Sequence, residues 1–196
     1  RSKNMDWYQG APLLNTLENL HISSDINKTD ARFPVQTVLR PQRDGFVDYR
    51  GYAGRVASGI FRPGDKVTVM PSGFTSTIKS IDTFEGELKE AYAPMSVSIT
   101  LENDIDVSRG DMIVKTTNQP KAVQEFDTML CWLNNNSASP KAKYTILHTS
   151  NEQKAMIKDV MYKIDINTYC REEEDKNLNM NDIARVKIRT TRPLMV

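Results

Sequence analysis

Between residues 32 and 114 the sequence consists of short runs of strand-forming residues, and residues typical of sharp turns separate them. The stretch Arg62-Pro63-Gly64-Asp65 suits a type II turn, because proline presets φ at the second position and glycine accepts a positive φ at the third. Residues 96–101 alternate between polar and apolar side chains, as a half-buried strand does. About six such strands with regular turns predict a small, closed, antiparallel β-barrel.

A second β series follows a polar, proline-containing stretch at residues 116–121. Its expected strands cover residues 126–133, 144–148, 155–167 and 183–190, and in the last one Ile183, Val186 and Ile188 are expected to face inward. About four strands are too few to close a small barrel. The chain therefore reads as all-β, with residues 31–117 forming one barrel and residues 118–196 a second, truncated one.

Residues 11–21 carry the only convincing helical pattern. Leu13, Leu14, Leu17 and Leu20 fall on one helix face, and Pro12 suits the first helical turn. An isolated helix of about three turns is marginal in water, so this apolar face should dock on something. We expect residues 1–30 to be the last helix of a larger preceding domain, followed by a linker.

Composition excludes several classes of protein. The formal net charge of +1 over 196 residues provides no general basic excess for nucleic-acid binding. No apolar run is long enough to span a membrane, and the start has no signal-peptide pattern. Cys131 and Cys170 are far apart, which favours reduced thiols and a cytoplasmic protein over a disulfide framework. We expect no nucleic acid and no membrane among its partners.

The sequence contains matches to catalytic and ligand-binding motifs, but each lacks the neighbouring residues that its chemistry needs. Residues 27–30 match the guanine-reading motif NKxD of GTPases, but a polar segment precedes them where the motif needs a buried strand. No GxxxxGK[ST] loop is present to hold phosphates. His21 and His148 lack further ligands at metal-binding spacing. The expectation is therefore that no residue of this chain is catalytic, cofactor-binding or metal-binding.

One segment could carry a contact. Residues 40–55 combine four arginines with three aromatic residues, and Tyr and Arg are enriched at protein interfaces. Two interpretations stay open: an ordinary exposed hairpin, or a contact surface for a neighbouring domain or subunit. The candidate interface residues are Arg40, Tyr49, Arg50, Tyr52 and Arg55.

The order of these motifs resembles a known superfamily. Phe33-Pro34-Val35-Gln36, the stretch 50–59 and the stretch 62–67 are similar to the second domain of elongation factor Tu relatives. The stretches 4–10, 40–41, 48–54, 106–111 and 162–168 resemble one branch, the large GTPase subunit of bacterial sulfate adenylyltransferase. This resemblance runs from residue 4 to the C-terminus.

The resemblance implies a function for a larger protein. Members of that branch join a GTP-binding domain to two β-barrels and form a heterodimer with a catalytic subunit. That subunit makes adenosine 5′-phosphosulfate and pyrophosphate from ATP and sulfate, and GTP hydrolysis drives the reaction. GTP and magnesium would bind in the GTP-binding domain, whose phosphate-binding loop this sequence lacks. The chain is thus expected to be a non-catalytic barrel region that contacts the catalytic subunit and its own GTPase domain.

Two other classes remain as alternatives. A translation elongation factor of the Tu or 1-alpha type would use similar barrels to bind aminoacyl-tRNA, although the near-neutral charge and residues 48–54 speak against it. A free-standing interaction protein built on such barrels is the other. The upstream sequence of the gene would discriminate between them.

Overall fold

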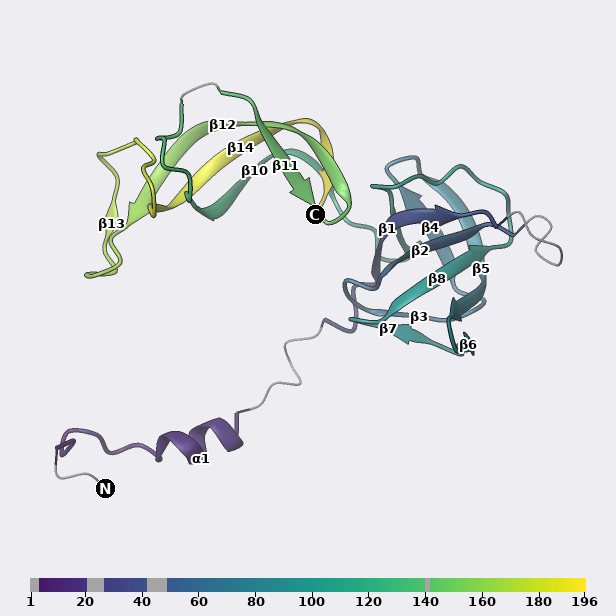
Figure 1. Ribbon diagram of the computed structural model, residues 1–196, viewed down its shortest axis with the longest axis horizontal. Coiled ribbons are helices and arrows are strands. Elements are labelled where there is room, and N and C mark those ends of the chain that lie inside the picture. The colour runs from purple at the N-terminus through teal and green to yellow at the C-terminus, as the bar shows by residue number, and fades with distance from the viewer. Residues whose placement is uncertain (1–3, 21–26, 42–48, 140–141) are drawn as a thin grey trace.

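The computed structural model describes residues 4–20, 27–41, 49–139 and 142–196. Two β units follow one another along the chain, and a short N-terminal helix stands apart from both (Figure 1). The elements of the first unit are β1 (Arg32–Leu39), β2 (Gly51–Arg55), β3 (Ile60–Phe61), β4 (Lys66–Met70), β5 (Phe74–Thr83), β6 (Gly86–Glu87), β7 (Ala91–Tyr92), β8 (Ser96–Leu101) and β9 (Met112–Lys115). Those of the second are β10 (Ala122–Cys131), β11 (Tyr144–His148), β12 (Asn151–Ile164), β13 (Arg171–Glu172) and β14 (Ile183–Met195).

The first unit is a closed barrel. Its strands pair in the order β4-β9-β1-β2-β8-β5-β6, and a further β4–β5 pairing closes the strands from β4 to β5 into a ring, with the short β6 attached to β5. The short strands β3 and β7 form a separate two-stranded ribbon. The predicted small antiparallel barrel is confirmed.

Two glycines make the turns of this barrel possible. Gly64 has φ +87° and Asp65 N donates to Arg62 O at 3.1 Å, so the predicted type II turn is present. Gly59 has φ +74°, and a Cβ added there would lie 2.6 Å from the backbone nitrogen of Ala31. Glycine is therefore required at this position, because any side chain would collide with the backbone of Ala31.

The barrel interior is a packed apolar core. Phe33, Phe61, Ile81, Ile99 and Ile113 are fully buried, and the rings of Phe33 and Phe61 meet edge to face with centroids 6.2 Å apart. The inward-facing side chains of the ring strands make up this core, because the closed ring shields them from water.

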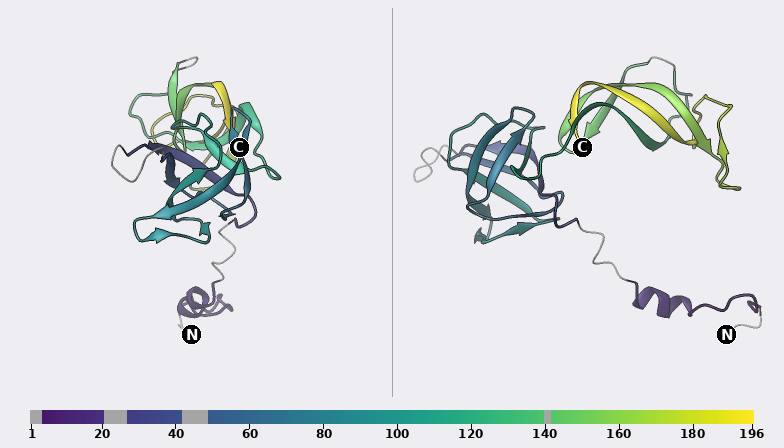
Figure 2. Two further views of the ribbon diagram at one scale, coloured as in Figure 1. Left: turned by 90° about the vertical axis from the view of Figure 1, so that its right-hand side faces the viewer. Right: turned by 180° about the vertical axis from the view of Figure 1, so that it is seen from behind.

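The second unit is an open, curved sheet (Figures 1 and 2). Its strands pair in the order β10-β14-β12-β11, and β13 adds a short pair with β12. Within the described residues no pairing joins β10 to β11, so both are edge strands. The prediction that the second barrel is incomplete is confirmed for this part of the chain.

One prediction about the inward face of β14 is wrong. Ala184 and Val186 are fully buried, and Ile188 packs beside them in the same apolar cluster. Ile183 is an odd number of residues away from all three and therefore lies on the other face of the strand. The small Ala184, and not the neighbouring Ile183, is therefore the inward-facing residue at the start of β14.

The N-terminal helix is shorter than predicted. α1 covers Leu13–Glu18, and Pro12 precedes it as the N-cap residue. Leu13, Leu14, Leu17 and Leu20 are between 55% and 74% exposed, so no described residue covers the apolar face. Among the described residues this six-residue helix is the only one, and it is far too short to cross a bilayer.

The two β units meet along a small junction. Met70, Met112 and Val114 of the barrel pack with Met195 of β14. Asn151 Nδ2, at the start of β12, donates to the carbonyl of Gly110 at 3.2 Å. The junction therefore combines a thioether-rich apolar contact with one hydrogen bond across the units.

Candidate functional site

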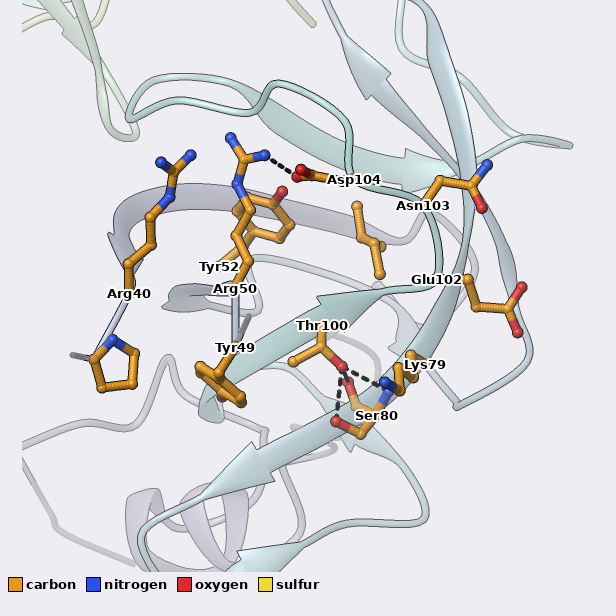
Figure 3. Close-up of a pocket in the computed structure, with 12 residues that line it drawn as sticks. Arg40, Tyr49, Arg50, Tyr52, Lys79, Ser80, Thr100, Glu102, Asn103 and Asp104 are labelled. Carbon is orange, nitrogen blue, oxygen red and sulfur yellow. Dashed lines mark hydrogen bonds and ion pairs between the residues drawn. The ribbon is translucent and has the colours of Figure 1, made fainter. Parts of the chain in front are cut away.

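A groove of about 680 Å³ lies on the closed barrel, where the end of β1 and the start of β2 come beside the middle of β5 and the end of β8 (Figure 3). Its lining combines cationic, aromatic and acidic side chains. The lining residues are Arg40, Pro41, Tyr49, Arg50, Tyr52, Lys79, Ser80, Thr100, Leu101, Glu102, Asn103 and Asp104.

A β-bulge shapes one side of the groove. The register between β5 and β8 shifts between Ile78 and Ser80, which leaves Lys79 as the extra residue. The Thr100 hydroxyl oxygen accepts from Ser80 N at 3.0 Å and lies 2.8 Å from the Ser80 hydroxyl. This hydroxyl pair fixes the bulge, and exposed Lys79 lines the groove beside it.

Tyr49 is held against the sheet by its hydroxyl. Its Oη donates to the Asp82 carboxylate at 3.1 Å and lies 3.3 Å from the Ser98 hydroxyl. A Cβ at Gly51 would come within 2.8 Å of the Tyr49 ring, so glycine leaves the space in which this ring lies. Burial raises the pKa of Tyr49, which remains a neutral hydrogen-bonding phenol at physiological pH.

Arg50 is the most buried charge of the groove. Its guanidinium pairs with Asp104 and with Asp106, the latter at 3.4 Å. The Arg50 side chain is 19% exposed, whereas those of Asp104 and Asp106 are 84% and 86% exposed. Within the described residues, Arg50 Nε is buried without a hydrogen-bond acceptor. A largely desolvated cation thus depends on two carboxylates that water surrounds.

The aromatic ring of Tyr52 packs against the guanidinium group of Arg50. Its ring centroid lies 5.8 Å from the Arg50 guanidinium carbon, which is within cation–π distance. The Tyr52 hydroxyl donates to Ile105 O at 3.0 Å and so anchors the loop that carries Asp104 and Asp106. Burial raises the pKa of Tyr52, and the positive charge of Arg50 opposes that shift.

Two further cations line the groove without acidic partners among the described residues, Arg40 and Lys79. Arg40 and Arg50 both line the groove, and their guanidinium groups are turned to the same side of it (Figure 3). Two guanidinium groups that face one groove favour an anion there, because each offers a planar fork of N–H donors.

Four of the five sequence-predicted interface residues therefore converge on this groove: Arg40, Tyr49, Arg50 and Tyr52. Arg55 does not line it, since its Nε donates to the carbonyl of Pro94 at 3.0 Å. Arg43 and Phe46, also noted in this segment, lie outside the described residues. That these residues form an interface stays a prediction.

The remaining lining residues were not foreseen. Lys79, Ser80 and Thr100 come from strands far away in sequence, and strand pairing alone brings them to the groove. The only sequence signal near them is the polar set of the alternating run 96–101, which is common on any solvent-facing strand.

The motif match at residues 27–30 is structural. Asn27 Oδ1 accepts from Thr29 N and Asp30 N at 2.9 Å, which makes a local turn. Asp30 in turn accepts from Asn118 Nδ2 at 2.6 Å and so ties the entry to the barrel to the linker between the units. In the described part of the chain no three His, Cys, Asp or Glu residues are grouped to hold a metal ion.

Comparison with protein families matches both β units. Residues 52–114 match elongation factor Tu domain 2, and residues 125–196 match the GTP-eEF1A C-terminal domain-like family. The first match lies within the closed barrel and the second within the open sheet.

Curated relatives match the chain over nearly its whole length. It is 44% identical over 197 residues to the "Bifunctional enzyme CysN/CysC" of Mycobacterium tuberculosis, covering 100% of this chain and 32% of that protein. It is 45% identical over 194 residues to "Sulfate adenylyltransferase subunit 1" of Bacteroides fragilis, covering 99% of this chain and 40% of that protein. The chain thus spans well under half the length of these relatives.

A solved structure shares the arrangement of the elements. The structure of sup35 complexed with GDP superposes with a TM-score of 0.75 at 18% identity, covering 97% of this chain and 46% of that one. At this identity the likeness concerns the fold alone, and it agrees with two β units of the translation-factor type.

Proposed function

We propose that this chain, a homologue of sulfate adenylyltransferase subunit 1 along nearly its whole length, is the non-catalytic barrel region of a GTP-hydrolysing subunit of that enzyme. The observation that carries the proposal is the identity of 44% and 45% to two relatives with these names, across both β units. In this role the chain helps to couple GTP hydrolysis to the formation of adenosine 5′-phosphosulfate and pyrophosphate from ATP and sulfate.

We assign no part of the chemistry to residues of this chain. The groove holds cations, phenols and carboxylates, but the phenols hydrogen-bond to neighbouring groups and Arg50 is paired. We place GTP and Mg²⁺ on the GTP-binding domain of such a subunit. The contribution of the barrels is then mechanical, as bodies that a nucleotide-dependent domain can reposition.

The groove on the closed barrel is the surface that we assign to the catalytic subunit. Its residues Arg40, Tyr49, Arg50 and Tyr52 combine the side-chain types that dominate binding energy at interfaces. The closed ring of strands supports them, so contact there can pass force to the whole barrel. Coupling of this kind requires contacts that differ between the two nucleotide states.

A heterodimer in the cytoplasm fits the remaining features. Cys131 and Cys170 are exposed free thiols, which is typical of proteins in a reducing compartment. The near-neutral formal charge of +1 favours a protein partner over a tRNA.

Binding of the catalytic subunit to the full-length protein tests this function. We expect a stable complex in size-exclusion chromatography, and sulfate-dependent pyrophosphate release from that complex that increases with GTP. Addition of aminoacyl-tRNA should not alter its elution. Tight binding of aminoacyl-tRNA together with no affinity for the catalytic subunit would overturn the proposal.

A further inference from the structure

The Arg40–Arg50 end of the groove fits one kind of contact, and this inference rests on the function proposed above. We propose that a carboxylate side chain of the catalytic subunit binds between Arg40 and Arg50, and that Asp104 and Asp106 hold Arg50 until that carboxylate replaces them. The two aspartates are then an internal competitor for the binding site.

The imbalance of burial supports the exchange. Arg50 is 19% exposed and needs a counter-charge, while Asp104 and Asp106 are more than 80% exposed. Exposed carboxylates contribute little to an ion pair, because water screens them and their side chains lose freedom on pairing. Releasing them to solvent is therefore inexpensive, provided that another anion takes their place at Arg50.

Because of Arg40, the site should bind a carboxylate of the catalytic subunit more tightly than it binds Asp104 and Asp106. The guanidinium group of Arg40 is turned to the same side of the groove as that of Arg50 (Figure 3), and Arg40 has no acidic partner among the described residues. A carboxylate that reaches both guanidinium groups would accept hydrogen bonds from both, whereas among the described residues Asp104 and Asp106 pair only with Arg50. The incoming group thereby satisfies one cation more than the group that it displaces.

The rest of the groove favours a protein surface over a small molecule or a nucleic acid. Small-ligand sites bury most of the ligand, but here five lining residues are exposed: Arg40, Lys79, Glu102, Asn103 and Asp104. Glu102, on the other side of the groove from Arg40 (Figure 3), would also repel a chain of phosphates that extends along the groove. A single acidic side chain on a protein surface can reach the two arginines without approaching Glu102.

The proposal is tested by whether neutralising Asp104 and Asp106 strengthens or weakens binding of the catalytic subunit. In the full-length protein, the double substitution Asp104→Asn and Asp106→Asn removes the competitor, so Kd for the catalytic subunit in low salt should fall about three- to tenfold. Arg40→Gln should raise Kd about tenfold and weaken its dependence on salt. Calorimetry or biolayer interferometry measures both effects.

Matched substitutions on the second unit control for net charge. The double substitution Asp127→Asn with Asp159→Asn, and separately Arg185→Gln, change the same charges on exposed positions of β10, β12 and β14 and should leave Kd within about twofold. Thermal melting verifies that each variant folds, as we expect for the exposed Arg40, Asp104 and Asp106.

Four results would overturn the inference. Weaker binding by the Asp104 and Asp106 variant would mean that these aspartates contact a basic partner. Unchanged Kd in all groove variants would place the contact elsewhere. The same gain in affinity from the double substitution Asp127→Asn with Asp159→Asn would reduce the effect to net charge. If the wild-type protein does not bind the catalytic subunit at all, the proposed function fails, and this inference fails with it.

Discussion

The closed barrel and the open sheet use the same kind of strand with different results. In the barrel, the β4–β5 pairing completes the ring, and large residues such as Phe33, Phe61 and Ile99 are fully buried. In the open sheet, alternation is equally regular, yet Ile157 and Ile188 are only partly buried. Ring closure, more than the strand pattern, decides whether an alternating face becomes a packed core.

The open sheet compensates in part with its loops. Leu178, in the segment between β13 and β14, is 1% exposed and packs on Val160 and Val186. Lys163 fastens the same segment, since its Nζ donates to Asp175 at 2.5 Å and to Asp182 at 3.0 Å. An ion-paired loop therefore covers some of the surface that further strands cover in the barrel.

This difference also bears on function. A closed ring holds the lining side chains of the groove in fixed relation, because each lining strand is paired on both sides. Within the described residues, the open sheet instead leaves one edge of β10 and one edge of β11 unpaired, which suits association with other strands. We therefore place the specific contact on the barrel.

The largest expected effect is the loss of stability when isoleucine is replaced by alanine in the closed barrel, compared with the same replacement in the open sheet. Ile99→Ala leaves a cavity in the closed core and should lower the free energy of unfolding by about 4 kcal/mol. Ile188→Ala removes a partly exposed side chain and should cost about 1.5 kcal/mol. Urea unfolding followed by circular dichroism measures both values. Equal losses would show that closure does not set the burial.

Two glycine substitutions sharpen the account of the barrel. Gly59→Ala places a methyl group against the backbone of Ala31 at a positive φ, and we expect a loss of about 3 kcal/mol. Gly64→Ala has a positive φ but open space around it, so only about 1 kcal/mol should be lost. The difference between their thermal midpoints is the measurement. A cost at Gly64 as large as at Gly59 would contradict the close approach.

The smallest expected effect concerns Lys163 in the open sheet and depends on pH. The hydrogen bond from Lys163 holds the pKa of Asp175 below its ordinary value. Because the folded-state pKa is the lower one, this stabilisation is present above about pH 4 and is lost as the pH falls through the folded-state value. Acidification should therefore loosen the loop between β12 and β14.

Lys163→Met should remove that pH dependence and speed proteolysis of residues 165–182, while the barrel stays resistant. Limited proteolysis between pH 3 and pH 7 reports both, with Lys158→Met as the control, since Lys158 pairs with Glu125 on β10 and not with the loop. An unchanged pH profile in the Lys163 variant would show that the ion pair of Lys163 with Asp175 does not hold the loop.

Local chemistry made much of the fold predictable. The type II turn at residues 62–65 and the strands at 66–70 and 144–148 follow from proline, glycine and alternation, which act over a few residues. The helix is shorter than its pattern because no described residue covers its leucines. The face of Ile183 was misjudged because one residue of offset inverts a strand.

The groove was only half predictable. Arg40, Tyr49, Arg50 and Tyr52 are close in sequence, so their composition alone indicated a candidate contact. Lys79 reaches the groove through the pairing of β5 with β8. Asp104 reaches it through its ion pair with Arg50, more than fifty residues away in the chain. No local pattern marks residues that a register brings together.

Hydrogen exchange on the complex with the catalytic subunit tests the central claim most directly. The account predicts slower exchange in peptides that cover residues 49–52 and 100–106 of the barrel when the catalytic subunit binds. Exchange on β14 of the open sheet should not change. Unchanged exchange at the groove, with protection confined to β10–β14, would contradict the assignment of the contact to the closed barrel.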